Sequence, residues 1–312
     1  MAGIHRDELI DILAKIERIE HEFGPLPGIA TAAQKQCWAQ QIVSSLRRIS
    51  YINALLMRKV DPARCDPHSS IFDPLRGAIY LSRKREFDEA VWLTFILTHF
   101  GKHALDGWKL SANVYGSFDV GPKWAFAAYR DSPQAFENML IANKNNLASL
   151  DVSGRFSNHR KFESKKPEAI AKTFRTFYDW QTKFGGFRER IVATHEKVGQ
   201  EPRAAFHELY LSMMGISRFG GGRLGRFDFL TMLGKLELAP IVPGSVYLNG
   251  ASGPLDGAKL LFFGDRKHAI TGKVLEPRVD ALDEVLNVGK QVIEDSLCNW
   301  QKSPENYVFF RG

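Results

Sequence analysis

Two aspartates stand where a carboxylate could act on a substrate. Asp256 lies in ASGPLDGAKLLFF, at the start of an apolar segment typical of a helix, and Asp228 lies among arginines in RFGGGRLGRFDFLTMLGK. A fixed carboxylate stabilises the positive charge that builds on a sugar as an N-glycosidic bond breaks, and it can also orient an attacking water. Structural interpretations remain open for both residues: Asp256 can cap a helix, and Asp228 can pair with Arg223 and Arg226.

Three glycines precede Arg223, and helical patterns lie on both sides of them, at about 202–214 and 223–236. In a helix-hairpin-helix unit, the hairpin and the start of the second helix expose backbone N–H groups that have no partner inside the protein. A phosphate can accept from these groups, helped by the helix dipole and by nearby arginines. The pattern predicts a non-specific clamp on a DNA backbone, with a plain glycine-capped hairpin as the alternative. The residues of the predicted clamp are Arg218, Gly220, Gly221, Gly222, Arg223 and Arg226.

The stretch VWLTFILTHFGKHALDGW places His99, Lys102 and His103 at the end of a helix expected at about 87–106. The spacing of four residues puts both histidines on one helical face. A zinc pair is one interpretation, but the glutamate of the HExxH motif is missing and no third ligand is evident, so we expect no metal. We expect these three residues to border a pocket for a base; histidines packed and hydrogen-bonded in the interior are the alternative.

Basic and aromatic residues are interleaved in FSNHRKFES, between Phe156 and Phe162. Phosphate contacts and base stacking both use this combination, and a solvated loop is the alternative. The polar donors of this stretch are Asn158, His159, Arg160 and Lys161; we expect the first two in the base pocket and the last two on DNA.

The chain of 312 residues carries a net charge of +7. Residues 151–235 contain 16 lysines and arginines against nine acidic residues, a surplus that equals the charge of the whole chain. Such a surplus is typical of a face that binds a polyanion, although a solvated surface produces it too.

Three scattered cysteines form no CxxC pair, which favours a reduced, cytoplasmic protein. The charged N-terminus is unlike a signal peptide, and the longest apolar run is far short of the ~20 residues that a membrane span needs. Neither a Walker A loop nor a Rossmann fingerprint is present, so we expect no cofactor. We expect no membrane association and no obligate protein partner.

Strand signals are few, and apolar residues recur at helical spacing along most of the chain, which predicts a mainly α fold. The expected helices lie at about 7–22, 32–58, 87–106, 122–130, 132–149, 167–184, 202–214, 223–236, 255–263 and 278–298.

Three long stretches resemble, in order, the alpha-glutamyl/putrescinyl thymine pyrophosphorylase family. They are FDPLRGAIYLSRKREFDEAVWLTFILTHFGKH…GW, FSNHRKF and RFGGGRLGRFDFLTMLGKL…PGSVYLNGASGPLDGAKLLF, within about residues 72–264. Members of this family are regarded as relatives of helix-hairpin-helix DNA glycosylases. The resemblance implies two helical lobes with a cleft between them and an enzyme acting on a modified pyrimidine in DNA.

The resemblance leaves two chemistries open. Transferase members replace an activated group on the 5-methylene of thymine in phage DNA, whereas cellular members are similar to anti-phage glycosylases that remove glucosylated hydroxymethylcytosine. Asp256 occupies the variable position of a GPL-x-GA stretch, and a carboxylate there favours a glycosylase. If that position is merely variable, Asp228 becomes the better catalytic candidate.

The leading interpretation is therefore a DNA glycosylase that hydrolyses the N-glycosidic bond of a hypermodified pyrimidine in phage DNA, as a defence. The target base would have to leave the stack before entering a pocket. A transferase joining an amine or amino acid to the 5-position of thymine is the first alternative, and a non-catalytic DNA-binding module the second. We expect an N-terminal helical segment at 1–70, a catalytic core at 71–270 and a C-terminal helix within 271–312 that packs back on the core.

Overall fold

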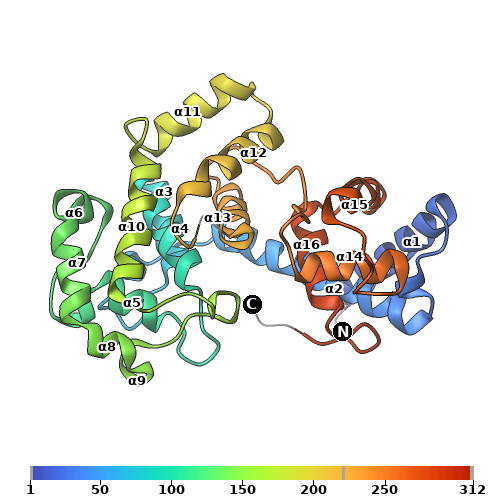
Figure 1. The fold of residues 1–312 in the computed structure, drawn as a ribbon, viewed down its shortest axis with the longest axis horizontal. Helices are drawn as coiled ribbons and strands as arrows, with labels where there is room; N and C mark the ends of the chain where they lie inside the picture. Colours follow the sequence, from blue (N-terminus) through green and yellow to red (C-terminus); the bar gives the residue numbers. More distant parts are fainter. Residues whose placement is uncertain (1–2, 220–221, 310–312) are drawn as a thin grey trace. The chain divides into compact units, whose positions relative to one another are not determined.

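The computed structural model describes residues 3–219 and 222–309, and within them it forms helices joined by loops (Figure 1). No strand occurs in the described chain, where an isolated β-bridge joins His103 to Gly107. The mainly α class predicted from the sequence is confirmed. Gly220 and Gly221, two of the glycines predicted to contact DNA, lie outside the described residues.

The chain divides into two compact units. Unit 1 contains residues 1–53 and 243–311, and unit 2 contains essentially residues 54–242. These boundaries differ from the three consecutive segments expected from the sequence. The C-terminal residues group with the N-terminal helices in unit 1, where the last helix, α16 (Lys290–Trp300), packs against α14 (Gly253–Phe263), at the end of the segment expected to be the core.

Unit 1 surrounds an apolar core that includes Trp38 and Trp300, whose rings lie 6.2 Å apart. Helix α14 packs against α16, and Gly257 allows their close approach: a Cβ there would lie 2.4 Å from the carbonyl oxygen of Leu297. The α-helices of this unit are α1 (Gly3–Phe23), α2 (Ala32–Leu56), α14 (Gly253–Phe263), α15 (Gly272–Leu286) and α16 (Lys290–Trp300), with the short 3-10 helix η1 (Pro27–Ile29).

The single helix predicted at 278–298 is wrong, because two helices, α15 and α16, cover this range. Asn287 caps α15 in the left-handed region with φ 50°, and Gly289 follows with φ 90°. Asparagine and glycine tolerate these angles, so the NVG sequence ends one helix and permits the next. The apolar residues of this range lie on both helices and remain buried or partly buried in the core.

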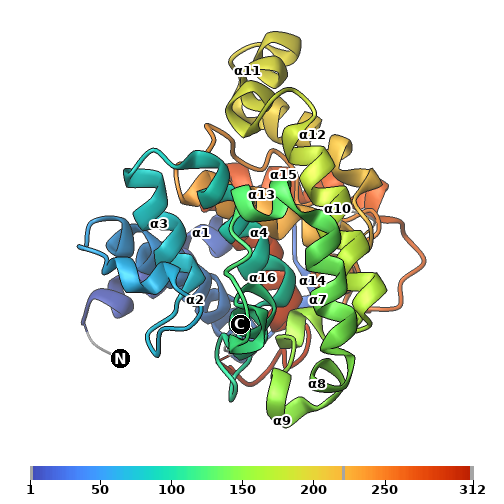
Figure 2. The ribbon, with the colours of Figure 1, turned by 90° about the vertical axis from the view of Figure 1, so that its left-hand side faces the viewer.

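Unit 2 is built around α4, which packs against α3, α11 and α13, while α10 runs beside α7 (Figure 2). Its α-helices are α3 (Pro74–Arg83), α4 (Phe87–Phe100), α5 (Lys109–Tyr115), α6 (Phe126–Asp131), α7 (Pro133–Ala142), α8 (Lys144–Ala148), α9 (Leu150–Ser153), α10 (Pro167–Thr182), α11 (Phe187–Val198), α12 (Pro202–Ser212) and α13 (Arg223–Lys235). The 3-10 helices are η2 (Pro62–Cys65), η3 (Ser117–Asp119), η4 (Asn158–Arg160) and η5 (Met213–Gly215).

The core of unit 2 is rich in aromatic side chains contributed by α4, α10 and α13. Phe95 stacks on Phe177 with ring centroids 3.9 Å apart, and Phe229 meets Phe177 edge-on at 5.3 Å. Aromatic pairs of this kind add to the free energy gained from burial alone. The core thus fixes α4, α10 and α13 relative to one another, and these helices position the site described below.

Helix α4 ends at Phe100, six residues before the predicted end. Gly101 adopts φ 67°, and a Cβ at this position would lie 2.1 Å from Oγ of Ser157. Only glycine fits both the angle and the contact, so the helix stops here. Helices α3, α5, α9 and α11 were missing from the prediction. None of the helices within the described residues is long and apolar enough to cross a membrane.

Candidate active site

An ion pair between Arg160 and Asp228 lies at the centre of the candidate site. Nη2 of Arg160 lies 2.8 Å from Oδ2 of Asp228, and the exposed fractions of the two side chains are 4% and 34%. Arg160 also donates from Nε to the carbonyl oxygen of Thr98 at 2.9 Å. A buried guanidinium therefore holds a carboxylate that still reaches solvent. The pair joins FSNHRKF, RFGGGRLGRFDF and the end of α4, which the sequence had left as separate candidates.

Local hydrogen bonds turn Arg160 inward. The N–H of Ser157 donates to the carbonyl of Phe100, and the N–H of Arg160 donates to the carbonyl of Ser157, so η4 is fastened to the end of α4. In this turn Arg160 is buried, while three neighbouring side chains are exposed: Asn158, His159 and Lys161. Arg160 was predicted to bind DNA; in the structure it is buried and pairs with Asp228.

A second ion pair ties the hairpin to the same loop. Nε of Arg218 lies 3.0 Å from Oε2 of Glu163, whose side chain is 3% exposed, and Nη2 of Arg218 donates to the carbonyl of Phe162. Arg218 adopts φ 55°, in the left-handed region that non-glycine residues rarely occupy. The arginine expected to neutralise a phosphate thus already faces a buried carboxylate.

His99 lies behind the Arg160–Asp228 pair, inside the aromatic core. Its side chain is 1% exposed, stacks on Phe95 and meets Phe219 edge-on, and neither ring nitrogen has a hydrogen-bond partner among the described residues. Burial, and then the positive charges of Arg160 and Arg218, lower the pKa of His99 to about 3. The ring is therefore neutral at ordinary pH. Its burial is inconsistent with direct access to solvent at a pocket border.

The segment predicted to be a helix-hairpin-helix unit contains α12 (Pro202–Ser212), η5 and α13 (Arg223–Lys235), close to the helices expected at 202–214 and 223–236. Its described N–H groups are less open than expected. Those of Ile216, Phe219 and Gly222 donate to backbone carbonyls within the hairpin, and that of Ser217 donates to Oγ1 of Thr176. The N–H groups in the first turn of α13 remain, because a helix has no internal acceptors for them.

The other two arginines of the predicted clamp pack against aromatic rings. Arg226 lies over Tyr210, with Cζ 4.0 Å from the ring centroid, and donates to the carbonyl of Tyr210. Arg223 is buried, with Cζ 4.7 Å from the Phe227 centroid. The expected pairing of Asp228 with Arg223 and Arg226 is replaced by the pair with Arg160. Helical geometry explains why: residues two or five positions apart do not share a helical face.

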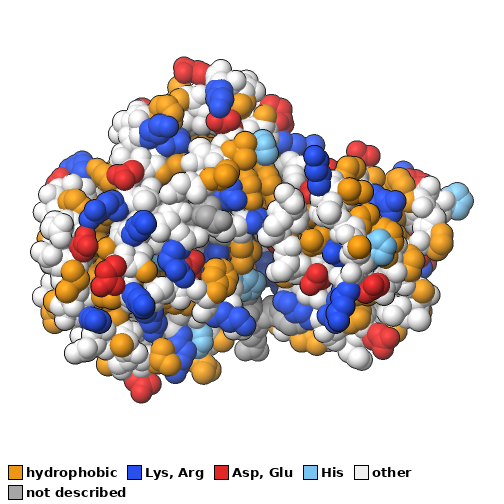
Figure 3. Space-filling view, viewed as in Figure 1, with side chains coloured by type: hydrophobic (Ala, Val, Ile, Leu, Met, Phe, Trp, Pro, Cys, Tyr) orange, Lys and Arg blue, Asp and Glu red, His pale blue; other side chains and the backbone are white. Residues whose placement is uncertain are grey.

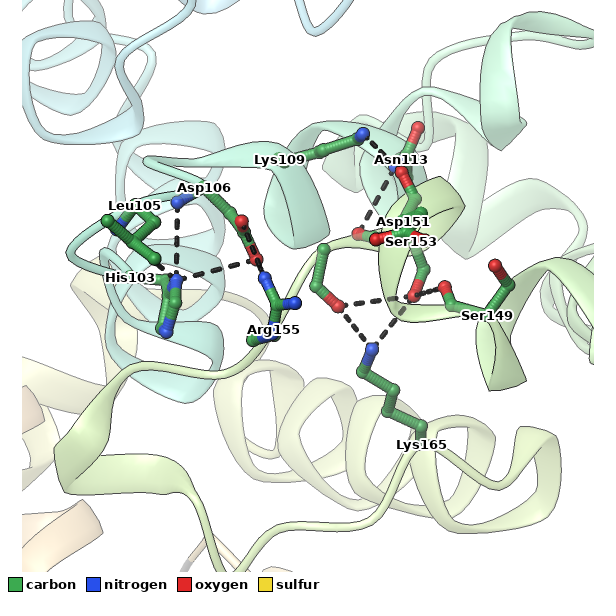
Figure 4. A network of polar contacts seen from close by, with 11 residues as sticks. His103, Leu105, Asp106, Lys109, Asn113, Ser149, Asp151, Ser153, Arg155 and Lys165 are labelled. Carbon is green, nitrogen blue, oxygen red and sulfur yellow. Dashed lines mark hydrogen bonds and ion pairs between the residues drawn. The ribbon is translucent and has the colours of Figure 1, made fainter.

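His103 does not share a helical face with His99, so that prediction is wrong. It follows the end of α4, and its Nδ1 accepts from the N–H groups of Leu105 and Asp106 (Figure 4). Lys102 is exposed, with Nζ 6.0 Å from the Trp108 ring centroid. No group of three histidine, cysteine or acidic side chains within the described chain is arranged to hold a metal.

Asp256 lies in unit 1, in the first turn of α14, and Asp228 lies in unit 2. Asp256 is partly exposed, and its carboxylate forms no hydrogen bond or ion pair with any residue that the structure describes. It does not act as the N-cap, a position that Ser252 occupies. The negative charge still stands near the positive end of the helix dipole.

Over the α7 and α10 side of unit 2, lysine and arginine side chains recur with acidic side chains among them (Figure 3). The sequence interpretation missed Glu163, which pairs with Arg218, and the ion pair between Asp106 and Arg155. Charge counts cannot find such pairs, because the partners lie in different segments of the chain.

A family model described as alpha-glutamyl/putrescinyl thymine pyrophosphorylase clade 3 matches residues 33–312. Comparison with curated proteins and with solved structures found no match to the chain. The matched region includes both aspartates, the hairpin and the loop at 156–163, and the family's printed activity fits the transferase alternative better than the glycosylase. The chain therefore belongs to the alpha-glutamyl/putrescinyl thymine pyrophosphorylase family, which is a family of enzymes.

Proposed function

We propose that this protein is a transferase that joins an amine, such as an amino acid or a polyamine, to the 5-methylene group of a thymine in DNA. The family membership supports the reaction class. The observation that carries the proposal is the half-exposed carboxylate of Asp228, held 2.8 Å from the buried guanidinium of Arg160. In this proposal the activated thymine carries pyrophosphate on its 5-methylene oxygen.

The reaction would replace one bond at that methylene carbon. The nitrogen of the amine forms the new C–N bond, the C–O bond to pyrophosphate breaks, and pyrophosphate leaves with the electron pair. The attacking amine is protonated in neutral water and has to lose a proton to become a nucleophile. A carboxylate can bind the ammonium ion and accept that proton, which is the role we assign to Asp228.

Arg160 would act on the reaction through Asp228, as a positioning residue. Because Arg160 is buried and also donates to the Thr98 carbonyl, it cannot swing away when substrate enters.

The glycosylase remains a second candidate because of Asp256, whose carboxylate is unpaired among the described residues and partly exposed. Hydrolysis of a glycosidic bond uses a carboxylate as a base or nucleophile, a role that is open to a carboxylate without an ion-pair partner. Modified phage DNA would be the substrate in that case, and an abasic site the product.

One experiment separates the two reactions. DNA carrying a pyrophosphate ester on the 5-methylene of thymine is incubated with the protein and with glutamate or putrescine. Mass spectrometry of the digested nucleosides, together with an assay of released pyrophosphate, should find an amine-linked nucleoside and pyrophosphate in equal amounts. Alkali-labile breaks in glucosylated hydroxymethylcytosine DNA, without any amine adduct, would instead establish the glycosylase. Binding of DNA without either product would leave only the non-catalytic module.

A further inference from the structure

Two lysines flank the turn at residues 151–155 and contact only neutral oxygens there. Nζ of Lys109 donates to the carbonyl of Asp151 at 2.5 Å, and Nζ of Lys165 donates to Oγ of Ser153 at 2.8 Å and to the carbonyl of Gly154 (Figure 4). Neither ammonium group forms an ion pair with a carboxylate of the described chain. Lys109 is exposed, but Lys165 is partly buried, and a partly buried ammonium without an ion-pair partner is unusual because burial penalises an unpaired charge.

Arg155 adds a third cation beside the same turn. Its Nη1 lies 2.9 Å from both carboxylate oxygens of Asp106. Asp106 is itself 3.4 Å from Nδ1 of His103. The carboxylate of Asp106 neutralises Arg155, whereas the positive charges of Lys109 and Lys165 have no carboxylate partner in the described chain.

The electrostatics of Lys165 reflect that surplus. Burial, and then the positive charge of Arg155, lower the pKa of Lys165, while the carboxylate of Asp106 opposes the shift. An anion bound between the two cations would relieve both effects. Donors for it are present: an ammonium has three N–H groups, of which Lys165 uses two, and a guanidinium has five, of which Arg155 uses the two on Nη1.

The turn that carries these groups is held firmly. Nδ2 of Asn113 donates to the carbonyls of Val152 and Ser153, and Oγ of Ser153 lies within hydrogen-bond distance of the carbonyls of Leu147 and Ser149. Gly154 adopts φ 80°, and a Cβ there would lie 2.9 Å from Cβ of Lys109. The cations are thus arranged before any ligand arrives, which reduces the entropy that binding must overcome.

We propose that Arg155 and Lys165 form a phosphate-binding site over Gly154. The ligand is a phosphate group, supplied either by the DNA backbone or by the pyrophosphate that the transfer releases. The choice of these two sources rests on the proposed function. The site itself does not, since it is built from residues that take no part in the proposed chemistry. Lys109, on the other side of the turn, strengthens the positive field.

Direct binding to the full-length protein tests this proposal without turnover. Inorganic pyrophosphate is titrated by calorimetry, and an unmodified, labelled DNA duplex by fluorescence anisotropy at several salt concentrations. Lys165→Gln should weaken binding of at least one ligand by about 10-fold or more, which corresponds to about 1.4 kcal/mol. Lys166→Gln is the matched control: Lys166 is the exposed neighbour and its ammonium has no contact in the described chain, so its affinities should stay within about 2-fold of wild type.

The two ligands distinguish the sources. If the site holds backbone phosphate, the slope of log affinity against log salt for DNA should become shallower by about one unit in Lys165→Gln. If it holds the leaving group, only pyrophosphate affinity should fall. Arg155→Gln removes the second cation and leaves the contacts of Lys165 with Ser153 and Gly154 intact, so it should show the same loss of ligand affinity. If Lys165→Gln does not fold, the affinities of Arg155→Gln alone test the site. Affinities in folded variants that match those of Lys166→Gln, for both ligands, would overturn the site. Because no product is measured, this result is independent of whether the protein is a transferase.

Discussion

Arg160 and Asp228 stand 68 positions apart in the chain and form a 2.8 Å ion pair in which the arginine is buried and the aspartate half-exposed. The pair links the 3-10 turn η4 to the middle of α13. The carboxylate of Asp228 is held by Arg160 on its buried side and reaches solvent on the other side. It can therefore bind a ligand without first reorganising, which is the physical basis of the role proposed for it.

Asp228→Asn should lower the rate of amine transfer by about 100-fold or more, the scale of losing one general base or charge stabiliser. The amide keeps the shape and one acceptor for Arg160 but cannot take a proton. Single-turnover rates with saturating enzyme measure the chemical step, and DNA affinity should change by less than about 3-fold. Near-normal single-turnover transfer by the folded variant would remove Asp228 from the mechanism.

Asp256→Asn makes the same chemical change at the first turn of α14. If the protein is a transferase that uses Asp228, this variant should keep its transfer rate within about 3-fold, because Asp256 has no described partner whose loss would disturb the fold. A glycosylase that uses Asp256 gives the opposite result, with base excision lost by about 100-fold and DNA affinity unchanged. The ratio of the two variants' single-turnover rates therefore reports which carboxylate acts.

Much of the fold could be predicted from the sequence, since helical spacing of apolar residues located α10, α12 and α13 to within two residues. The errors arose where the backbone turns: the NVG sequence splits the last helix, and Gly101 stops α4 before His103. For the site, motif composition selected Arg160 and Asp228 but paired Asp228 with the wrong arginines. Pairing across 68 positions depends on how the aromatic core sets α4 and α13, which no local pattern encodes.

Gly225→Ala should destabilise the protein, although alanine usually favours a helix over glycine. A Cβ at Gly225 would lie 2.2 Å from the carbonyl oxygen of Phe219, so α13 and the hairpin would have to separate. Overpacking of this kind costs about 1–3 kcal/mol. Urea unfolding measures the change. Gly222→Ala is the matched control, because its Cβ would meet only the carbonyl oxygen of Arg218, at 3.8 Å, and it should cost less than about 1 kcal/mol as an N-cap change.

Equal losses in the free energy of unfolding of the two glycine variants would mean that Phe219 of the hairpin does not contact α13 at Gly225 as described. A larger loss for Gly225→Ala, accompanied by weaker DNA binding, would connect the position of the hairpin to substrate binding. Both variants carry the same glycine-to-alanine substitution, at positions three residues apart. Because Gly222 is the N-cap and Gly225 lies in the first turn of α13, the difference in helix propensity between the two positions has to be subtracted before the losses of stability are compared.

The buried imidazole of His99 should make stability depend on pH. Its pKa is lowered to about 3 in the folded protein, whereas an unfolded histidine titrates near 6.5. Between these two values the unfolded chain binds a proton at His99 that the folded protein does not bind. The free energy of unfolding is therefore unaffected by His99 above about pH 6.5, and it decreases as the pH falls from 6.5 toward 3.

His99→Leu removes this titrating group and should therefore flatten the pH dependence of the free energy of unfolding in this window, by up to ~1.4 kcal/mol per pH unit. At neutral pH the variant should be as stable as wild type or more so, because it removes two buried nitrogens that lack partners. Urea unfolding from about pH 4 to pH 8 measures both effects, with His159→Leu as an exposed-histidine control that should retain the wild-type slope. A slope in His99→Leu identical to that of wild type would show that His99 is not held neutral by its surroundings.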